Sequence, residues 1–400
     1  MKQDVFFNHA SLCALPWSGV FVNPNGNVKN CAISSEVIGD INQTPIDKIV
    51  NNNVNQTIRT DMLNGLKQRR CNPCYSVENN STAKISQSNR SWYKKVAIKN
   101  ISMDIFDSPE NFELNVLDLR WRNTCNFACV YCGPDLSSHW ASLMDDTRWT
   151  IGEQNLKLSK DYIFNHLDTV KHVYLAGGEP LLMKDNHELL THLYKVNPDV
   201  EIRINSNISN IHGPVFNQLQ KFKNVKWTIS VESTEAYFEY MRWPGKWDEF
   251  VKNALTIKQY VGDQINFNMV WCILNPFEIF ETFDFLIDQG FHENMFVVQC
   301  LTDPTPLSVL HLPSEHIQDL KNKILRRLEN ANPQWWLYKS LDSMYNFLSH
   351  SAPKFKTSFQ IQSGSDGIKG TIEFLKKIDI FRNTESRHLF KELYHIHDSL

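Results

Sequence analysis

Cys125-Asn-Phe-Ala-Cys129-Val-Tyr-Cys132 brings three cysteines onto one short stretch of the chain. Three thiolates spaced in this way can hold three irons of a four-iron cubane, which leaves the fourth iron open to a substrate or cofactor. The same i, i+4, i+7 spacing would also fit one buried face of a helix. Asn123-Thr124 precedes the first cysteine and Gly133-Pro134 follows the last, and these breaker residues favour a loop. We therefore expect three metal ligands on a loop.

A second motif follows a short apolar stretch. His172-Val-Tyr-Leu-Ala176 has the composition of a strand, and Gly177-Gly178-Glu179-Pro180 comes directly after it. Paired glycines let the backbone approach a ligand closely, because they carry no Cβ. The Glu179 carboxylate can accept an amine, and Pro180 suits the first turn of a helix. By itself, the motif could also be an ordinary turn between a strand and a helix.

Together the two motifs resemble those of the radical S-adenosylmethionine (SAM) enzymes. In that family, a Cys-x3-Cys-x2-Cys loop follows the first strand of a partial (β/α)6 barrel, and Gly-Gly-Glu-Pro follows the second. The resemblance implies a [4Fe–4S] cluster on the three cysteines, with SAM at its open iron and its amine near Gly177, Gly178 and Glu179. Reductive cleavage of SAM would then give a 5′-deoxyadenosyl radical that abstracts hydrogen from a C–H bond. The cofactor carries this chemistry, and the protein positions it.

The middle of the chain shows six strand–helix repeats. Each predicted strand is a short alternating or apolar stretch, and the segments between strands carry apolar residues at helical spacing. The predicted strands are Leu114–Trp121, Val173–Ala176, Val200–Ile204, Val225–Val231, Ile265–Leu274 and Met295–Gln299, and the helices include Lys184–Lys195 and Trp247–Tyr260. Such alternation predicts a parallel sheet with ligands at the carboxyl ends of its strands. We predict an α/β fold, a partial (β/α)6 TIM-like barrel of the radical SAM type.

Polar residues after the later strands match further SAM-binding positions of the family. Ser230 and Glu232 match a Ser-x-Asp motif, with a longer Glu in place of Asp. Arg242 matches an arginine that pairs with the SAM carboxylate, and a guanidinium can meet a carboxylate through two hydrogen bonds. Loop hydrogen bonds, loop packing and solvation are the alternative roles. The resemblance therefore adds, as SAM-binding residues, Tyr131, Asn205, Asn207, Ser230, Glu232 and Arg242.

Four more cysteines lie near the N-terminus: Cys13, Cys31, Cys71 and Cys74. The stretch from Val20 to Cys31 contains Pro-Asn-Gly and predicts a hairpin with Cys13 and Cys31 near its ends. Four thiolates can saturate a zinc ion or a four-iron cubane, so ligand number alone does not identify the metal. The Cys-x(9–15)-Gly-x4-Cys pattern resembles the auxiliary-cluster domain called SPASM, or its shortened form, twitch. Four cysteines suit one twitch-type [4Fe–4S] cluster.

The order of these parts is unusual for the family, because the auxiliary domain commonly follows the barrel and here precedes it. Motifs from Cys13 to Leu393 nevertheless resemble a group of twitch-containing radical SAM proteins with this order, whose reactions are poorly defined. Full ligation by four cysteines would let the auxiliary cluster relay electrons without binding substrate. Exchange of one cysteine for substrate, or a purely structural role, is the alternative.

Composition limits the class of protein. The 400 residues carry a net charge of −3, with 42% hydrophobic and 12% aromatic residues, which is ordinary for a soluble globular enzyme. This charge argues against a dominant nucleic-acid surface, since phosphate binding depends on clustered lysine and arginine. Lys67–Arg70 is a local basic run and most simply a solvated face. Arg90–Lys95 is basic and aromatic and could contact RNA, but no nucleic-acid-binding module surrounds it.

No secretory signal opens the sequence and no apolar run could span a membrane, so we expect a cytoplasmic protein. Thiols stay reduced in the cytoplasm, which makes grouped cysteines metal ligands or catalysts before disulfides. Cys272 and Cys300 lie outside both groups, and we expect them to be small core residues rather than cluster ligands or radical quenchers. The resemblance implies a flavodoxin- or ferredoxin-like reductant as partner.

Three segments follow from these patterns. We predict an auxiliary module with a linker at 1–112, a radical SAM barrel at 113–305 and a mostly helical region at 306–400, interrupted around Ser363–Gly370. Residues 76–112 are expected to link the first two. We predict a radical SAM enzyme that modifies a peptide or protein side chain. A radical SAM enzyme acting on a sugar, nucleoside or amino acid, or a non-catalytic iron–sulfur or zinc protein, is the alternative, and no catalytic acid or base is identified.

Overall fold

The computed structural model describes residues 1–34, 36–79, 88–149, 151–350 and 367–399. The chain divides into two compact units. The first unit contains Met1–Thr124, Thr147–Asn205 and His212–Lys226, and the second contains Cys125–Asp146, Ser206–Ile211 and Trp227–Leu400. Neither unit is a single continuous segment, because the chain passes from one to the other several times.

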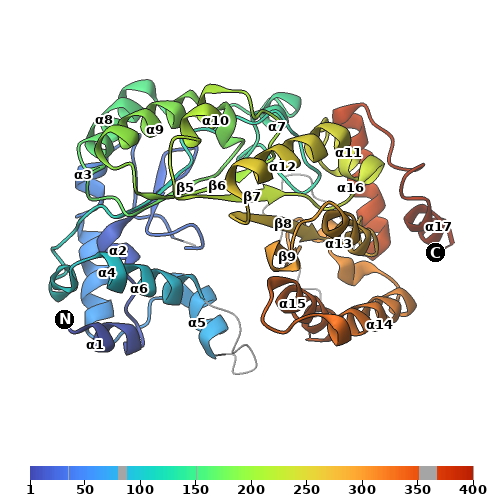
Figure 1. Cartoon of the computed structure of the whole chain (residues 1–400), viewed down its shortest axis with the longest axis horizontal. Coiled ribbons are helices and arrows are strands. Elements are labelled where there is room, and N and C mark those ends of the chain that lie inside the picture. Colours follow the sequence, from blue (N-terminus) through green and yellow to red (C-terminus); the bar gives the residue numbers. More distant parts are fainter. Residues whose placement is uncertain (35, 80–87, 150, 351–366, 400) are drawn as a thin grey trace. The chain divides into compact units, whose positions relative to one another are not determined.

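The first unit is built on a sheet with the strand order β3-β2-β1-β4-β5-β6 (Figure 1). β1 and β2 form the predicted hairpin, and β2 pairs with β3 in the same antiparallel sense. β1 pairs in parallel with β4, and β5 and β6 extend the parallel order. The N-terminal hairpin and the first strand–helix repeats therefore share one sheet. Its strands are β1 (Gly19–Val22), β2 (Asn27–Lys29), β3 (Gly39–Asp40), β4 (Val116–Leu119), β5 (His172–Leu175) and β6 (Glu201–Ser206).

The two faces of this sheet differ in polarity, because side chains alternate along each strand. One face is apolar and has no exposed surface at Val173, Leu175, Ile202 and Ile204. Figure 1 shows this face covered by α8 (Glu153–Phe164), α9 (Lys184–Val196) and α10 (Pro214–Leu219). The other face is polar and lies against α6 (Asn89–Asn100), where the ring centroids of Trp92 and His172 are 5.1 Å apart.

Short helices flank the N-terminal hairpin in the chain, namely α1 (Gln3–Asn8), α2 (Leu15–Ser18), α3 (Ile46–Ile49), α4 (Asn53–Leu63), α5 (Asn72–Asn79) and the 3-10 helix Arg69–Cys71.

Residues 76–112 were expected to link two domains. They contain α6 and the 3-10 helix Met103–Asp107 within the first unit, and 80–87 lie outside the described residues. Arg90 and Lys94 of α6 are buried, and they donate to the carbonyls of Leu12 at 3.0 Å and His9 at 2.7 Å. These two cations are therefore not part of an exposed RNA-binding patch.

Arg59 of α4 joins the segments of this N-terminal part and has no exposed surface. Its guanidinium donates to the carbonyl oxygens of Pro16 at 2.9 Å, Val50 at 2.6 Å and Pro109 at 2.9 Å. Burial lowers the pKa of Arg59 to about 10, so the side chain stays charged at neutral pH. One cation thus satisfies carbonyl groups from three separate stretches of the chain.

The second unit contains three parallel strands in the order β7-β8-β9. These are β7 (Val225–Ser230), β8 (Ile265–Trp271) and β9 (Phe296–Cys300), and the helices between or before them are α7 (Ser138–Leu143), α11 (Glu235–Met241), α12 (Trp247–Val261), α13 (Glu278–Asp288) and the 3-10 helix Glu293–Met295. The C-terminal part is helical, with 3-10 helices at Thr305–Leu307 and Val309–His311 followed by α14 (Ser314–Asn330), α15 (Trp336–His350), α16 (Gly367–Arg382) and α17 (Lys391–Ser399) (Figure 1). α15 packs against β9, where Val298 N–H donates to Ser340 Oγ at 3.0 Å.

The predicted alternation of strands and helices is confirmed, with strand ends displaced by up to three residues. β8 ends at Trp271 rather than Leu274, because Asn275 turns the chain and its side chain accepts from Cys272 N–H at 2.8 Å.

Cys272 is fully buried, as expected for a core residue, whereas Cys300 is only partly buried. In the predicted interruption at Ser363–Gly370, residues 363–366 lie outside the described residues, whereas Gly367–Gly370 form the first turn of α16, so the prediction is wrong for these four residues. Among the described helices, none combines the length and apolar character needed to cross a membrane.

Replacing Arg59 by methionine should destabilise the first unit by about 3 kcal/mol, because buried carbonyl groups lose charge-assisted donors. Urea unfolding followed by tryptophan fluorescence would measure the change. Arg326→Met, at an exposed position of α14, is the matched control and should change stability by less than about 0.5 kcal/mol. Equal unfolding midpoints for the two variants would contradict the role given to Arg59.

Candidate functional site

Residues 125–132, here called the cysteine loop, contain no helix or strand. The structure thus agrees with the loop predicted at the three cysteines and not with a helix. Two backbone hydrogen bonds tie the loop to the chain at the end of α11. Ala128 N–H donates to Trp243 O at 2.7 Å, and Val130 N–H donates to Met241 O at 2.9 Å. A turn closes the loop where Cys132 N–H donates to the carbonyl of Cys129 at 3.1 Å.

Side chains of α7 and of its N-cap residue, Ser137, donate hydrogen bonds to backbone carbonyl oxygens of the cysteine loop. In a helix or strand, backbone N–H groups would bond to such oxygens. The three contacts are Ser138 Oγ to Cys125 O at 3.1 Å, Ser137 Oγ to Phe127 O at 2.6 Å and Trp140 Nε1 to Cys129 O at 2.8 Å. Because buried backbone carbonyl groups need partners, these bonds fix the course of the loop and the direction of its side chains.

Arg382, the last residue of α16, supplies a fourth donor to the cysteine loop. Its Nη2 donates to Ala128 O, and its Nη1 donates to Tyr240 O at 3.0 Å. The guanidinium lies over the Trp140 ring at 4.9 Å and is 3% exposed. The C-terminal helix therefore takes a direct part in holding the loop.

The three thiols of the loop influence one another. Burial raises the pKa of Cys132 well above its usual range, and the negative charges of Cys129 and Cys125 raise it further. In the described part of the chain, no group of three or more His, Cys, Asp or Glu side chains is placed to hold a metal ion as the side chains stand. Three neighbouring thiols on a loop held by its carbonyls are nevertheless the donor set of a cubane with one open iron, so the residues fit that group.

Arg242 joins two other residues predicted to contact SAM. Its Nη1 donates to Tyr131 OH at 2.6 Å and to the Glu232 carboxylate at 3.1 and 3.2 Å. Burial opposes the charge of Arg242, but the negative charges of Glu232, Tyr131 and Cys129, with the hydrogen bond to Glu232, together outweigh it and hold the guanidinium pKa well above its usual range. The charges of Arg242 and Glu232 also act on the buried thiol of Cys129. The structure therefore gathers Tyr131, Glu232 and Arg242 beside one cysteine of the loop.

The Arg242 side chain keeps one donor open. Its Nε is buried and has no hydrogen-bond acceptor among the described residues. A buried donor without a partner costs about 1–3 kcal/mol, and a bound carboxylate would satisfy it. The unpaired Nε–H could therefore donate to the carboxylate of a ligand. The Nη1 of the same guanidinium already donates to Glu232, a pairing that the sequence patterns did not predict.

The Gly-Gly-Glu-Pro turn packs on the residue that leads into the cysteine loop. Gly177 and Gly178 have positive φ values of 78° and 56°. A Cβ on Gly178 would lie 2.2 Å from Thr124 O, and Glu179 N–H donates to the same oxygen at 2.7 Å. Thr124 is bonded to Cys125, so this contact in the first unit reaches the residue next to the first cysteine.

The remaining predicted residues occupy the ends of strands. Glu179 has no exposed surface, and its Oε1 accepts from Leu181 N–H at 3.0 Å, which caps the 3-10 helix Pro180–Leu182. Asn205 lies on β6, and Ser230 is the last residue of β7. Asn207 lies with the cysteine loop in the second unit, where its Nδ2 is 3.2 Å from Asn126 Oδ1 and 4.0 Å from Cys125 Sγ.

The four auxiliary cysteines gather in the first unit. Burial raises the pKa of Cys13 well above its usual range, and the charges of Cys71 and Cys31 raise it further. Burial, together with the charges of Cys31 and Cys74, raises the pKa of Cys71 to about 12. Cys31 follows the hairpin, Cys71 ends the 3-10 helix Arg69–Cys71, and Cys74 lies in the first turn of α5. Four mutually coupled thiols fit the ligand set of one auxiliary cluster.

The sequence patterns missed the residues that hold the cysteine loop. Ser137 is the N-cap of α7 and accepts from Trp140 N–H, so a serine before a helix was a signal that could have been used. Arg382 is 254 residues from its acceptor Ala128, and no local pattern indicates that contact.

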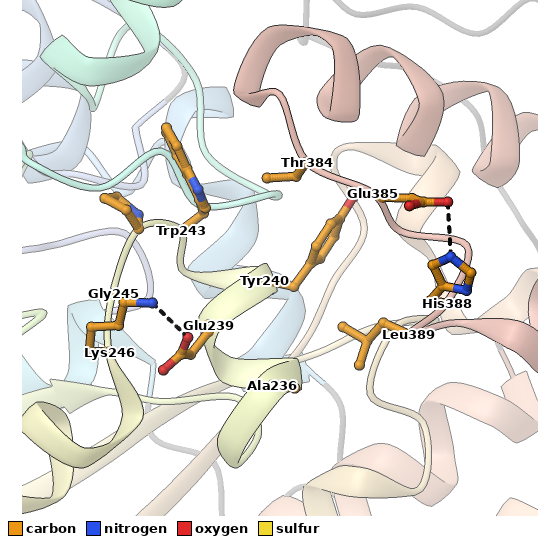
Figure 2. Close-up of a pocket in the computed structure, with 11 residues that line it drawn as sticks. Ala236, Glu239, Tyr240, Trp243, Gly245, Lys246, Thr384, Glu385, His388 and Leu389 are labelled. Carbon is orange, nitrogen blue, oxygen red and sulfur yellow. Dashed lines mark hydrogen bonds and ion pairs between the residues drawn. The ribbon is translucent and has the colours of Figure 1, made fainter.

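A pocket of about 400 Å³ opens on the second unit beside the segment that follows Arg242 (Figure 2). Lys246 Nζ pairs with Glu239 at 2.9 Å, and His388 lies 3.3 Å from Glu385. Tyr240 extends between these two pairs in Figure 2, and its hydroxyl donates to Asp379 at 2.9 Å. The positive charge of Lys246 offsets the negative charge of Glu239, and His388 offsets Glu385 when the imidazole is protonated. The lining of the pocket therefore carries little net charge in that state.

Two family models match the chain. The radical SAM superfamily model matches residues 121–286, which include the cysteine loop and the Gly-Gly-Glu-Pro turn. The SPASM model, an iron–sulfur cluster-binding domain, matches residues 13–75, which include all four auxiliary cysteines.

Individual proteins show shorter or weaker similarity. The chain is 30% identical over 83 residues to the GTP 3′,8-cyclase of Nautilia profundicola, and 28% identical over 90 residues to that of Campylobacter lari. Each match covers 21% of this chain and 24% of the relative, so it spans about a quarter of these curated relatives. Streptococcus suis SuiB bound to SAM is 16% identical with a TM-score of 0.38, covering 74% of this chain and 65% of that one.

The family models agree with the predicted fold class and cofactors. A radical SAM domain implies a [4Fe–4S] cluster with SAM, and a SPASM domain implies auxiliary iron–sulfur chemistry. The alternation of parallel strands with helices is the architecture expected of such a domain. The chain therefore carries a radical SAM domain at residues 121–286, preceded by a SPASM-type iron–sulfur cluster-binding domain at residues 13–75.

Proposed function

We propose that this protein is a radical SAM enzyme that cleaves SAM reductively and abstracts hydrogen from a peptide or protein side chain. The observation that carries the proposal is the packing of the Gly-Gly-Glu-Pro turn on Thr124, immediately before Cys125. This contact supports the proposal, because it holds the turn that would bind the SAM amine against the residue that is bonded to Cys125.

In this proposal the chain's own residues bind and orient the cofactors. Cys125, Cys129 and Cys132 hold the [4Fe–4S] cluster, which with bound SAM supplies the 5′-deoxyadenosyl radical. The Glu179 carboxylate accepts the SAM amine, and its complete burial would strengthen a charge-assisted hydrogen bond. The auxiliary cysteines Cys13, Cys31, Cys71 and Cys74 hold a second [4Fe–4S] cluster that relays electrons from a flavodoxin- or ferredoxin-like donor.

The SAM carboxylate is assigned to Arg242 through its open Nε. Tyr131 and Glu232 hold the guanidinium in place, so the arginine does not have to be ordered when SAM binds. Asn205, Asn207 and Ser230 are proposed as polar contacts to the ribose and carboxylate, since each lies at or after the carboxyl end of a strand.

A peptide substrate is proposed because SPASM and twitch relatives often modify peptides, a property carried over from the family resemblance. The matches to GTP 3′,8-cyclases favour a second candidate, a nucleotide or other small molecule. Deuterium-labelled peptides and metabolite pools, each incubated with enzyme, SAM and reductant, would separate these candidates. The class whose label enters 5′-deoxyadenosine contains the hydrogen donor.

The two cysteine groups should differ in their effect on SAM cleavage. Anaerobically reconstituted protein should hold about eight irons in two cubanes. Cys125→Ala should abolish release of 5′-deoxyadenosine, whereas Cys71→Ala should keep some uncoupled cleavage, because its radical SAM cluster is intact. Iron analysis and chromatography of 5′-deoxyadenosine would measure both effects. Equal and complete loss in both variants, or zinc in place of iron at the cysteine loop, would contradict the assignment.

Gly178→Ala should abolish SAM cleavage, because a Cβ there would meet Thr124 O at 2.2 Å and push the turn off Thr124, the residue bonded to Cys125. Gly262→Ala is a matched control, with a φ of 57° and nothing within 4 Å of its Cβ. Both substitutions place a Cβ at a positive φ, which costs about 1 kcal/mol or more, so loss of SAM cleavage in Gly178→Ala alone would point to the contact. Similar SAM cleavage by the two variants would argue against it.

Arg382→Met should lower the iron bound at the cysteine loop and the melting temperature, since Ala128 O and Tyr240 O lose their donor. The expected destabilisation is about 3 kcal/mol. Arg387→Met, at a half-exposed arginine of the same C-terminal part, is the control and should keep its iron. Iron content and the electron paramagnetic resonance signal of the reduced cluster are the measurements, and an unchanged signal in Arg382→Met would refute the role.

A further inference from the structure

One line of side chains crosses the polar face of the first unit's sheet, where parallel sheets of α/β proteins usually carry branched apolar residues. Strand register places its members directly opposite one another on five neighbouring strands. They are, in order, Lys29, Phe21, Asp118, Tyr174 and Arg203, here called the cross-strand row. Paired residues in adjacent strands project from the same face, so the five side chains share one surface.

The guanidinium groups at this surface are held by aromatic rings. Arg203 lies over the Trp92 ring at 4.6 Å, and Arg120, two residues beyond Asp118, lies over the Phe21 ring at 4.7 Å. Cation–π contacts of this kind orient a guanidinium while leaving the N–H groups at its edge free to meet a ligand. Both side chains keep part of their surface exposed, at 35% and 18%.

Charge at the row is not balanced. The row and its ion-pair partners contain four cations, Lys29, Arg120, Arg203 and Lys226, and two carboxylates, Asp118 and Glu201. Asp118 pairs with Arg120 at 3.2 Å, and Glu201 pairs with Arg203 at 3.0 Å and Lys226 at 2.8 Å. Lys29 lies two residues before Cys31, a proposed thiolate ligand, so we leave this lysine out of the balance. The remaining three cations exceed the two carboxylates by one positive charge on a partly buried surface, which favours an anion.

The row has two neighbours that matter for the proposed reaction. A Cβ on Gly177 would lie 2.8 Å from Arg120 Cβ, so the missing side chain gives this arginine its path beside the Gly-Gly-Glu-Pro turn. At the other end, Lys29 lies two residues before the auxiliary ligand Cys31. All of these contacts lie within the first unit. The surface therefore extends from the auxiliary cysteines to the turn assigned to SAM.

We propose that the cross-strand row, with Arg120, binds an oxyanion of the substrate, either a carboxylate or a phosphate. Arg203 and Arg120 are the principal donors, and the Tyr174 hydroxyl is a neutral donor beside them. The inference rests on the proposed function, because it assigns one group of the substrate of the same enzyme. It adds a requirement on that substrate: an acidic side chain or terminus in a peptide, or a phosphate in a small molecule.

Equilibrium dialysis of the reconstituted holoenzyme against radiolabelled inorganic phosphate and, separately, radiolabelled glutarate would test the inference. Saturable binding of at least one probe is expected, weakening as salt is raised. Arg203→Gln should weaken that binding about tenfold, because a charge-assisted donor is lost, and Arg203→Lys should weaken it less. Tighter binding of phosphate would indicate a phosphorylated small molecule, and tighter binding of glutarate an acidic peptide.

Two further variants keep the test decisive if Arg203→Gln does not fold. Lys226→Gln, at a side chain 41% exposed, should weaken binding about threefold. Arg326→Gln, on exposed α14 in the second unit, should leave it unchanged. Failure of the unaltered protein to bind either probe would overturn the inference. Equal binding by the unaltered protein, Arg203→Gln and Lys226→Gln would also overturn it.

SAM cleavage by the unaltered holoenzyme, measured in the same preparation, separates the two proposals. If this protein releases 5′-deoxyadenosine but binds neither anion, the oxyanion site is wrong and the proposed function stands. If it binds an anion through Arg203 but never cleaves SAM, the site stands as an anion site and the proposed function is wrong.

Discussion

The cysteine loop depends on hydrogen bonds to its own backbone carbonyl groups. A loop that has to present three thiols cannot pair those groups as a helix or strand does, and buried carbonyl groups without partners are costly. Here α7 supplies three donors and α16 supplies a fourth, Arg382. The C-terminal helical region is therefore part of the site, because Arg382, the last residue of α16, completes the support of the loop.

Sequence patterns located the parts of the site that depend on local chemistry. Cysteine spacing, paired glycines after a strand and the Pro-Asn-Gly turn of the hairpin are all local features, and the structure places a loop, a tight turn and a hairpin where they were predicted. Arg382 and the cross-strand row depend on residues brought together by folding, so no spacing indicates them. Arg90 and Lys94 likewise could not be placed from composition, since these two cations of a basic and aromatic run are buried against backbone carbonyl groups.

Glu232 departs from the family pattern, and its contact with Arg242 gives a physical reason for the longer side chain. The family motif has the shorter Asp, and the longer side chain of Glu232 reaches the guanidinium of Arg242 with both of its oxygens. A buried cation without a carboxylate partner would be strongly destabilising, and burial of the pair is tolerable only because Tyr131 adds a further hydrogen bond. The same arrangement keeps the arginine fixed while its Nε remains open, which is the preorganisation a carboxylate ligand requires.

The unusual chain order of the two domains matters less than strand pairing. The auxiliary cysteines come first in the sequence, yet β1 pairs in parallel with β4, the strand that leads toward the cysteine loop. This pairing covers an edge of β4 that would otherwise expose unpaired backbone groups, and it makes the hairpin before Cys31 part of the sheet that carries the Gly-Gly-Glu-Pro turn. A module placed after the barrel would need another edge of the sheet. The same pairing aligns Lys29 and Phe21 with Asp118, so the hairpin extends the cross-strand row beyond Asp118, Tyr174 and Arg203.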